Sequence, residues 1–175
     1  MAQKKLPDFV AGLGDSGRAT ADLAVVAIGN DAKNFEHLLE LCFSQPYPTC
    51  MRTSQVVQLF CEKNPEFILP FLDEIIDKIA VSKIAGVKRN FLKIIAESID
   101  FKLVKDNPTL LQISFDWLLS SKESPAIRYY CIHIITKLCS FEPDLKPEFK
   151  ATLEFIIPEA SKGLLNRALK TLKDL

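Results

Sequence analysis

The sequence predicts an all-α protein of 175 residues, built from pairs of helices. Apolar residues recur at spacings of three and four, the period of an amphipathic helix, as in FLKIIAESI at 91–99. No segment alternates apolar and polar residues over the length of a strand. Capping residues followed by proline recur along the chain and mark helix starts, because the first helical position needs no N–H donor.

These start signals divide the chain into segments of similar length. The clearest starts are Asn64-Pro65, Asn107-Pro108 and Ser124-Pro125, with Ser82 and Ser161 as further N-caps. Gly29 predicts the end of a lead-in helix at about residues 4–28, and Asp31 lies at the start of the next helix. The predicted pairs are 31–43 with 48–64, 65–81 with 82–99, 107–120 with 124–140, and 147–157 with 161–175.

The second helices of these pairs repeat one another. VKRNFLKII at 87–95 and IRYYCIHII at 127–135 share apolar residues at relative positions 1, 5, 6, 8 and 9, and a base at position 2. Looser copies begin at Met51 and Leu165, so the steps between copies are 36, 40 and 38 residues. A period of this length is typical of stacked helical repeats.

A V-R-x-x-A-A-like opening of the second helix, the period near 40 and Pro70 inside a first helix resemble HEAT-like α-solenoids, over about residues 31–175. The resemblance implies an α-α superhelix whose second helices line a concave face. Armadillo and other arrays of helical pairs remain alternatives. We expect one domain over 1–175, with a lead-in cap at 1–30 and repeats at 31–64, 65–99, 100–140 and 141–175.

CEKNPEFILPFL at 61–72 is similar to the junction between repeats in small bacterial HEAT-like proteins, some of which carry the name adenylosuccinate lyase. This chain is much shorter than that enzyme and lacks its serine-containing signature loop. The resemblance therefore does not imply lyase activity.

GLGDSG at 12–17 has the spacing of the dinucleotide-binding fingerprint G-x-G-x-x-G. That fingerprint works between a buried strand and a helix, whereas the preceding AQKKLPDFVA is charged and interrupted by proline. We interpret the glycines as a flexible joint in the lead-in, with Asp15 or Ser16 available to cap the following helix. No nucleotide or other cofactor is expected.

Composition also restricts the function. Apolar residues make up 48% of the chain and charged residues 25%, which is typical of soluble globular proteins. No apolar run approaches the roughly 18 residues of a membrane span, and no apolar signal segment follows MAQKKLPDF, so we expect a cytoplasmic protein without membrane contact.

The chemistry-bearing residues predict no catalytic or metal site. The five cysteines form no C-x-x-C motif and are expected to be free, buried thiols. His37 and His133 are the only histidines, they belong to different repeats, and no hydrolase, metalloprotease or P-loop motif is present. A catalytic carboxylate pair remains open, since acids such as Asp73, Glu74 and Asp77 are abundant. On an exposed helix, however, such acids most often only interact with water.

The zero net charge hides a division between helices. The second helices carry twelve bases and three acids, whereas the first helices, with 142–146 included, carry four bases and twelve acids. If the second helices line the concave face, as the resemblance implies, that face is electropositive and attracts anionic partners.

Helical geometry indicates which residues of the second helices point outward. On 82–99, Phe91 and Ile94 face the core, so Arg89 and Lys93 lie on the opposite side. The predicted partner-binding residues are Arg89, Lys93, Tyr129, His133, Asn166, Lys170 and Lys173. The alternative is that these residues form an ordinary solvent-exposed surface without a binding function. Lys88 and Arg128, at repeat position 2, are expected to brace adjacent repeats.

The sequence thus predicts a non-enzymatic scaffold or adaptor that holds an acidic protein segment or helix. The alternative is a nucleic-acid-binding protein resembling HEAT-like DNA-base glycosylases. A pI of about 6.7 and the expected burial of Trp117 favour the protein partner. A homodimer through the terminal repeat is a third expectation.

Overall fold

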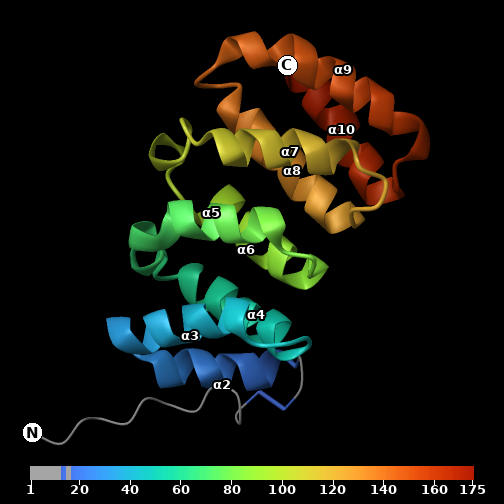
Figure 1. Ribbon diagram of the computed structural model, residues 1–175. Coiled ribbons are helices and arrows are strands. Elements are labelled where there is room, and N and C mark those ends of the chain that lie inside the picture. The colour runs from blue at the N-terminus through green and yellow to red at the C-terminus, as the bar shows by residue number, and fades with distance from the viewer. Residues whose placement is uncertain (1–12, 15–16) are drawn as a thin grey trace, which may run out of the picture. The chain divides into compact units, whose positions relative to one another are not determined.

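The computed structural model describes residues 13, 14 and 17–175, and all regular secondary structure in them is helical (Figure 1). The predicted all-α fold is therefore confirmed. The chain divides into two compact units, Met1–Phe71 and Leu72–Leu175. The single domain over 1–175 stays a prediction.

The first unit contains α2 (Arg18–Ile28), α3 (Ala32–Ser44) and α4 (Thr49–Cys61), and α4 packs against both α2 and α3. Gly29 follows α2 with a φ of 58°, a conformation that glycine adopts without steric cost. The Asp31 carboxylate accepts hydrogen bonds from the backbone N–H groups of Lys33 and Asn34. The predicted stop at Gly29 and start at Asp31 are both present.

The segment predicted as one helix over 65–81 is interrupted. The 3₁₀ turns η1 (Pro65–Phe67) and η2 (Leu69–Phe71) come first, and the α-helix α5 covers only Leu72–Val81. Pro70 has no N–H to donate to the carbonyl four residues earlier, and its ring clashes with that carbonyl in an α-helix. Asn64 does not cap this segment, because its Nδ2 donates backwards to the Phe60 carbonyl at 3.1 Å.

The second unit begins with α5 and stacks helix pairs in two layers (Figure 1). The pairs are α5 with α6 (Ala85–Ser98), α7 (Pro108–Leu119) with α8 (Pro125–Leu138), and α9 (Lys146–Ile156) with α10 (Lys162–Asp174). In one layer α7 packs between α5 and α9, and in the other α8 packs between α6 and α10. The connecting 3₁₀ turns are η3 (Phe101–Leu103), η4 (Pro143–Leu145) and η5 (Ile157–Glu159).

Two of the predicted caps in this unit are confirmed. Asn107 accepts a hydrogen bond from the Leu110 N–H at 2.9 Å, and Ser124 accepts one from the Ile127 N–H at 3.4 Å. Ser161 precedes α10 without a side-chain cap bond. These bonds satisfy amides that the first turn of a helix leaves without a partner.

Lys88 and Arg128 brace the second unit from inside. Lys88 Nζ lies 2.5 Å from a Glu123 carboxylate oxygen and 4.4 Å from the centroid of the Trp117 ring. Arg128 Nε donates to the Leu118 carbonyl at 2.9 Å. Lys88, Arg128 and Trp117 are all buried. Lys88 therefore joins adjacent predicted repeats, as expected, whereas Arg128 joins α7 to α8 within one predicted repeat. The core position of the tryptophan is confirmed.

The glycine loop that resembles a nucleotide fingerprint is anchored to α4. Arg52 Nη1 donates to the carbonyls of Leu13 and Gly14, at 2.9 Å in both cases, and Leu13 is buried. Gly17 precedes α2 without a side-chain cap bond. Gly12, Asp15, Ser16 and the predicted lead-in helix before them lie outside the described residues. The backbone carbonyls of Leu13 and Gly14 are thus hydrogen-bonded to α4.

All five cysteines are buried free thiols, as predicted. Burial raises the pKa of Cys42 to about 12, so its thiolate is scarcely populated at neutral pH. Within the residues that the structure describes, no three histidine, cysteine or acidic side chains gather as metal ligands. No described helix combines the length and apolarity that crossing a bilayer requires.

Candidate partner-binding face

The outward side of α6, α8 and α10 carries all seven residues predicted to bind a partner. We call this surface the second-helix face. On α6 the side chains of Phe91, Ile94 and Ile95 are buried, so Arg89 and Lys93 lie on the opposite side, as predicted. The residues of the face are Arg89, Lys93, Glu97, Tyr129, Tyr130, His133, Asn166, Arg167, Lys170 and Lys173.

The predicted residues reach solvent to different degrees. Arg89 and the three residues of α10 are exposed, whereas Lys93 and His133 are half-buried. Tyr129 is 37% exposed, so much of its ring is in contact with protein atoms. The face therefore has an aromatic centre that is partly covered and a charged margin that is open to water.

Two adjacent tyrosines form that centre. The rings of Tyr129 and Tyr130 are perpendicular, with centroids 5.4 Å apart and an interplanar angle of 89°. Arg167, on α10, places its guanidinium carbon 5.4 Å from the centroid of the Tyr129 ring. This cation–π contact joins α8 to α10 across the face.

Charged residues of α6 lie within electrostatic range of Tyr130. Burial raises the pKa of the Tyr130 phenol, and the Glu97 carboxylate raises it further. Lys93 and Arg89 act on that pKa in the opposite direction, because a positive charge favours the phenolate. Bases from both neighbouring helices thus lie within electrostatic reach of the tyrosine pair.

His133 lies in a positively charged environment. Its pKa is lowered from 6.5, first by burial and then by the charges of Arg167 and Lys137. The imidazole is therefore neutral at pH 7. A bound anion would offset the two positive charges and raise this pKa.

Some bases of these helices are engaged within the protein. Lys137 Nζ donates to the Ala96 carbonyl at 2.7 Å and lies 4.9 Å from the Phe101 ring centroid, which joins α8 to α6. Arg89 donates to Asn90 Oδ1, at 3.1 Å from Nη2 and 3.4 Å from Nε. Arg89 remains exposed despite this bond.

The two layers of the second unit differ in charge in the predicted sense. The helices α6, α8 and α10 carry nine bases and two acids, whereas α5, α7 and α9 carry three bases and six acids. Lys88, Arg128 and Lys137 make internal contacts, as do Arg89 and Arg167. Lys88 and Arg128 are buried, and the other bases of these helices are at least partly accessible to solvent.

Tyr130 and Arg167 are part of the face although the sequence did not single them out. In the repeat copy that begins at Leu165, Asn166 stands at position 2 and Arg167 at position 3, so the base lies one residue later than Lys88 and Arg128 do in their copies. The Nε of Arg167 is buried, without a hydrogen-bond partner among the described residues. Tyr130 follows Tyr129 directly, and this pair of aromatic residues was the available signal for Tyr130 in the sequence. The signal was indirect, because neighbouring residues of a helix point in different directions.

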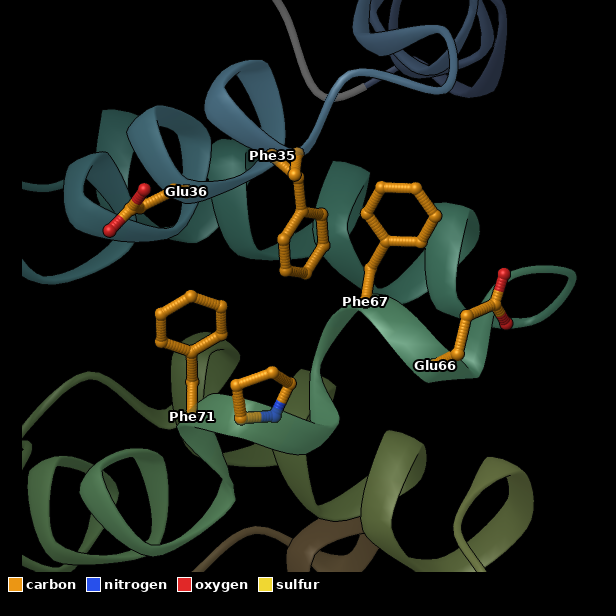
Figure 2. A pocket seen from close by; sticks show the side chains of 7 residues that line it. Phe35, Glu36, Glu66, Phe67 and Phe71 are labelled. Atoms are coloured by element: carbon orange, nitrogen blue, oxygen red, sulfur yellow. The ribbon is translucent and has the colours of Figure 1, made fainter.

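A second candidate site lies in the first unit, where sequence reasoning predicted none. The start of α3 and the turns η1 and η2 enclose a pocket of about 330 Å³ (Figure 2). Its main lining residues are Phe35, Glu36, Glu66, Phe67, Pro70 and Phe71.

The stacked helix pairs define the class of this protein, an α-helical repeat protein. A sequence model of the HEAT repeat domain matches residues 15–175. The chain therefore belongs to the HEAT repeat family, and the predicted HEAT-like architecture is confirmed. HEAT repeats generally mediate protein–protein interaction, and the family is typically non-catalytic. Comparison with curated proteins and with solved structures gives no match.

Proposed function

We propose that this protein is a non-enzymatic scaffold whose second-helix face binds an acidic segment of a partner protein. The observation that carries the proposal is the tyrosine pair with bases on both sides, Arg89 and Lys93 from α6 and Arg167 from α10. Tyrosine and arginine are the residues that most often dominate binding energy at protein interfaces. The surrounding bases would favour a partner rich in aspartate and glutamate.

The position of the tyrosines supports a local anchor rather than a uniformly charged surface. Tyr129 is held by Arg167 and Tyr130, so little side-chain entropy is lost when a partner covers its ring. Lys170 and Lys173 are exposed at the margin, where charges mainly increase the rate of association. We expect truncation of the tyrosines to speed dissociation and charge reversal at the margin to slow association.

The scaffold would act in the cytoplasm, the location expected from the sequence, and the similarity of residues 61–72 to small bacterial HEAT-like proteins favours a bacterial source. Nucleic acid is the alternative ligand of the same face, since nucleobases can also stack on aromatic rings that lie next to arginine. Of the two, the acidic protein segment fits better, because the face carries only five lysines and arginines and the chain carries no net charge.

Affinity capture with a matched pair of variants tests the proposal. The face variant reverses three exposed bases of the second-helix face, Arg89→Glu, Lys170→Glu and Lys173→Glu. The control variant reverses three exposed bases elsewhere in the same unit, Lys102→Glu, Lys122→Glu and Lys150→Glu. Both variants change the net charge equally, so a difference between them reports the place of the charge.

We expect quantitative mass spectrometry to find proteins that the wild type and the control retain and the face variant loses. An acidic peptide from such a protein should then bind the wild type in a fluorescence anisotropy titration. Identical captures by both variants would argue against the face. Salt-sensitive binding of duplex DNA, with no protein lost, would replace the proposal with the nucleic-acid alternative.

A further inference from the structure

The pocket in the first unit has a different chemistry from the second-helix face. Its volume, about 330 Å³, is near the lower end of the roughly 300–1,000 Å³ range of ligand pockets. A pocket of this size suits one long side chain rather than a helix or a nucleotide. It shares no residue with the second-helix face, and nothing in the proposed scaffold function requires it.

Aromatic rings form the wall of the pocket. Phe35, on α3, is almost fully buried, and its ring centroid lies 5.7 Å from that of Phe67 and 6.4 Å from that of Phe71. Phe60 supports the wall from behind, at 5.4 Å from Phe35 and 5.1 Å from Phe67. These contacts hold the rings in place before any ligand arrives.

The charged residues at the pocket are both acids. Glu36 and Glu66 are exposed and flank the phenylalanines on opposite sides (Figure 2). Among the described residues that line the pocket, no base offsets these carboxylates. A neutral apolar ligand would gain from the rings alone, whereas a ligand with an apolar stem and a positive head would gain from both the rings and the carboxylates.

We propose that this pocket binds the side chain of a lysine presented by a partner protein. The four-carbon stem of lysine packs against Phe67 and Phe71, with the buried Phe35 behind them, and the ammonium group lies at the mouth between Glu36 and Glu66. Lysine fits this arrangement better than arginine, because its ammonium is a compact point charge that is attracted to carboxylates on both sides, whereas a guanidinium binds one carboxylate in a fixed planar orientation. The site is thus complementary to a basic partner, whereas the second-helix face is complementary to an acidic one.

Titrations of the whole protein with blocked amino acids test this inference. The probes are N-acetyl-lysine N-methylamide, its arginine equivalent and its norleucine equivalent, which has the lysine stem without the charge. Binding is followed by ¹H–¹³C spectra of phenylalanine-labelled protein. We expect shifts of Phe35, Phe67 and Phe71, with the lysine probe binding about fivefold more tightly than norleucine, as expected for an exposed cation over aromatic rings with carboxylates nearby.

Variants separate the contribution of the glutamate charges to lysine binding from that of the phenylalanine rings. Glu36→Gln and Glu66→Gln should each weaken the lysine probe about threefold, the size of an exposed ion pair, and leave norleucine unchanged. Glu40→Gln is the matched control, because Glu40 is exposed on the same helix and does not line the pocket. Phe71→Leu keeps an apolar wall but removes a ring, so it should reduce the preference for lysine over norleucine.

Several results would overturn the inference. Equal binding of norleucine would make the pocket a site for an apolar residue, and tighter binding of the arginine probe would assign it to arginine. Shifts of the three phenylalanines that depend on protein concentration alone would show that a second copy occupies the pocket. The absence of any shift with all three probes, or unchanged lysine binding in both glutamate variants, would also refute the lysine site.

Discussion

Removing the charge of Glu123 should destabilise the second unit, because Lys88 would lose its counter-ion. The side chains of Lys88 and Glu123 are 11% and 16% exposed, so water screens them only in part. Exposed pairs contribute roughly 0–1 kcal/mol, whereas breaking a fully buried pair costs about 3–5 kcal/mol. We therefore expect Glu123→Gln to lower the free energy of unfolding by about 2 kcal/mol.

A double-mutant cycle with Lys88→Met isolates the pair, because methionine keeps much of the apolar stem. We expect the double variant to lose less stability than the two single losses combined, by about 1–2 kcal/mol. Trp117 is the assay: it is the only tryptophan, and its ring lies 4.4 Å from Lys88 Nζ, so its fluorescence follows urea unfolding of this unit. Additive losses, or a loss below about 0.5 kcal/mol for Glu123→Gln, would refute the bracing role of the pair.

Three further predictions concern other parts of the chain. Arg52→Ala removes both hydrogen bonds to the carbonyls of Leu13 and Gly14, so we expect a loss of about 1–3 kcal/mol and faster hydrogen exchange in α2; unchanged exchange would show that the loop needs no anchor. The pKa of His133 is lower in the folded protein, so the unfolded chain binds the proton more readily and stability should fall as the pH drops below about 6.5. His133→Gln should reduce this loss between pH 7 and pH 5 in urea titrations, and an unchanged pH dependence would contradict the assignment. Phe155 is 65% exposed on α9 of the terminal repeat, and if the expected homodimer forms there, Phe155→Lys should make it monomeric in sedimentation equilibrium; a wild type that is already monomeric at high concentration would exclude the dimer.

The fold was predictable because its signals are local. Asn107 and Ser124 cap the helices that they precede, and the three-and-four spacing of apolar residues places the buried side of each helix correctly. The exception is the segment before α5, where Pro70 interrupts the α-helix. A longer helix was predicted there because its apolar spacing continues across the proline.

The candidate sites were only partly predictable, because they depend on contacts between distant residues. The outward direction of Arg89 and Lys93 follows from the apolar spacing within their own helix. In the structure Arg89 is exposed and Lys93 is half-buried, on the side opposite the buried residues of α6. The contact of Arg167 with Tyr129 joins two helices, and the offset of Arg167 by one residue within the repeat concealed it. The pocket of Phe35, Phe67 and Phe71 likewise requires the meeting of α3 with η1 and η2, which no local pattern encodes.

Site-specific photo-crosslinking tests the central claim most directly, that the second-helix face binds an acidic protein segment. A photoreactive phenylalanine analogue replaces Tyr129 in one variant and Asp116, which is exposed on α7, in a control. We expect the Tyr129 position alone to capture a peptide rich in aspartate and glutamate, and Lys170→Glu with Lys173→Glu to reduce the yield of this crosslink. Capture of the same peptide from both positions, or of nucleic acid at the Tyr129 position, would contradict it.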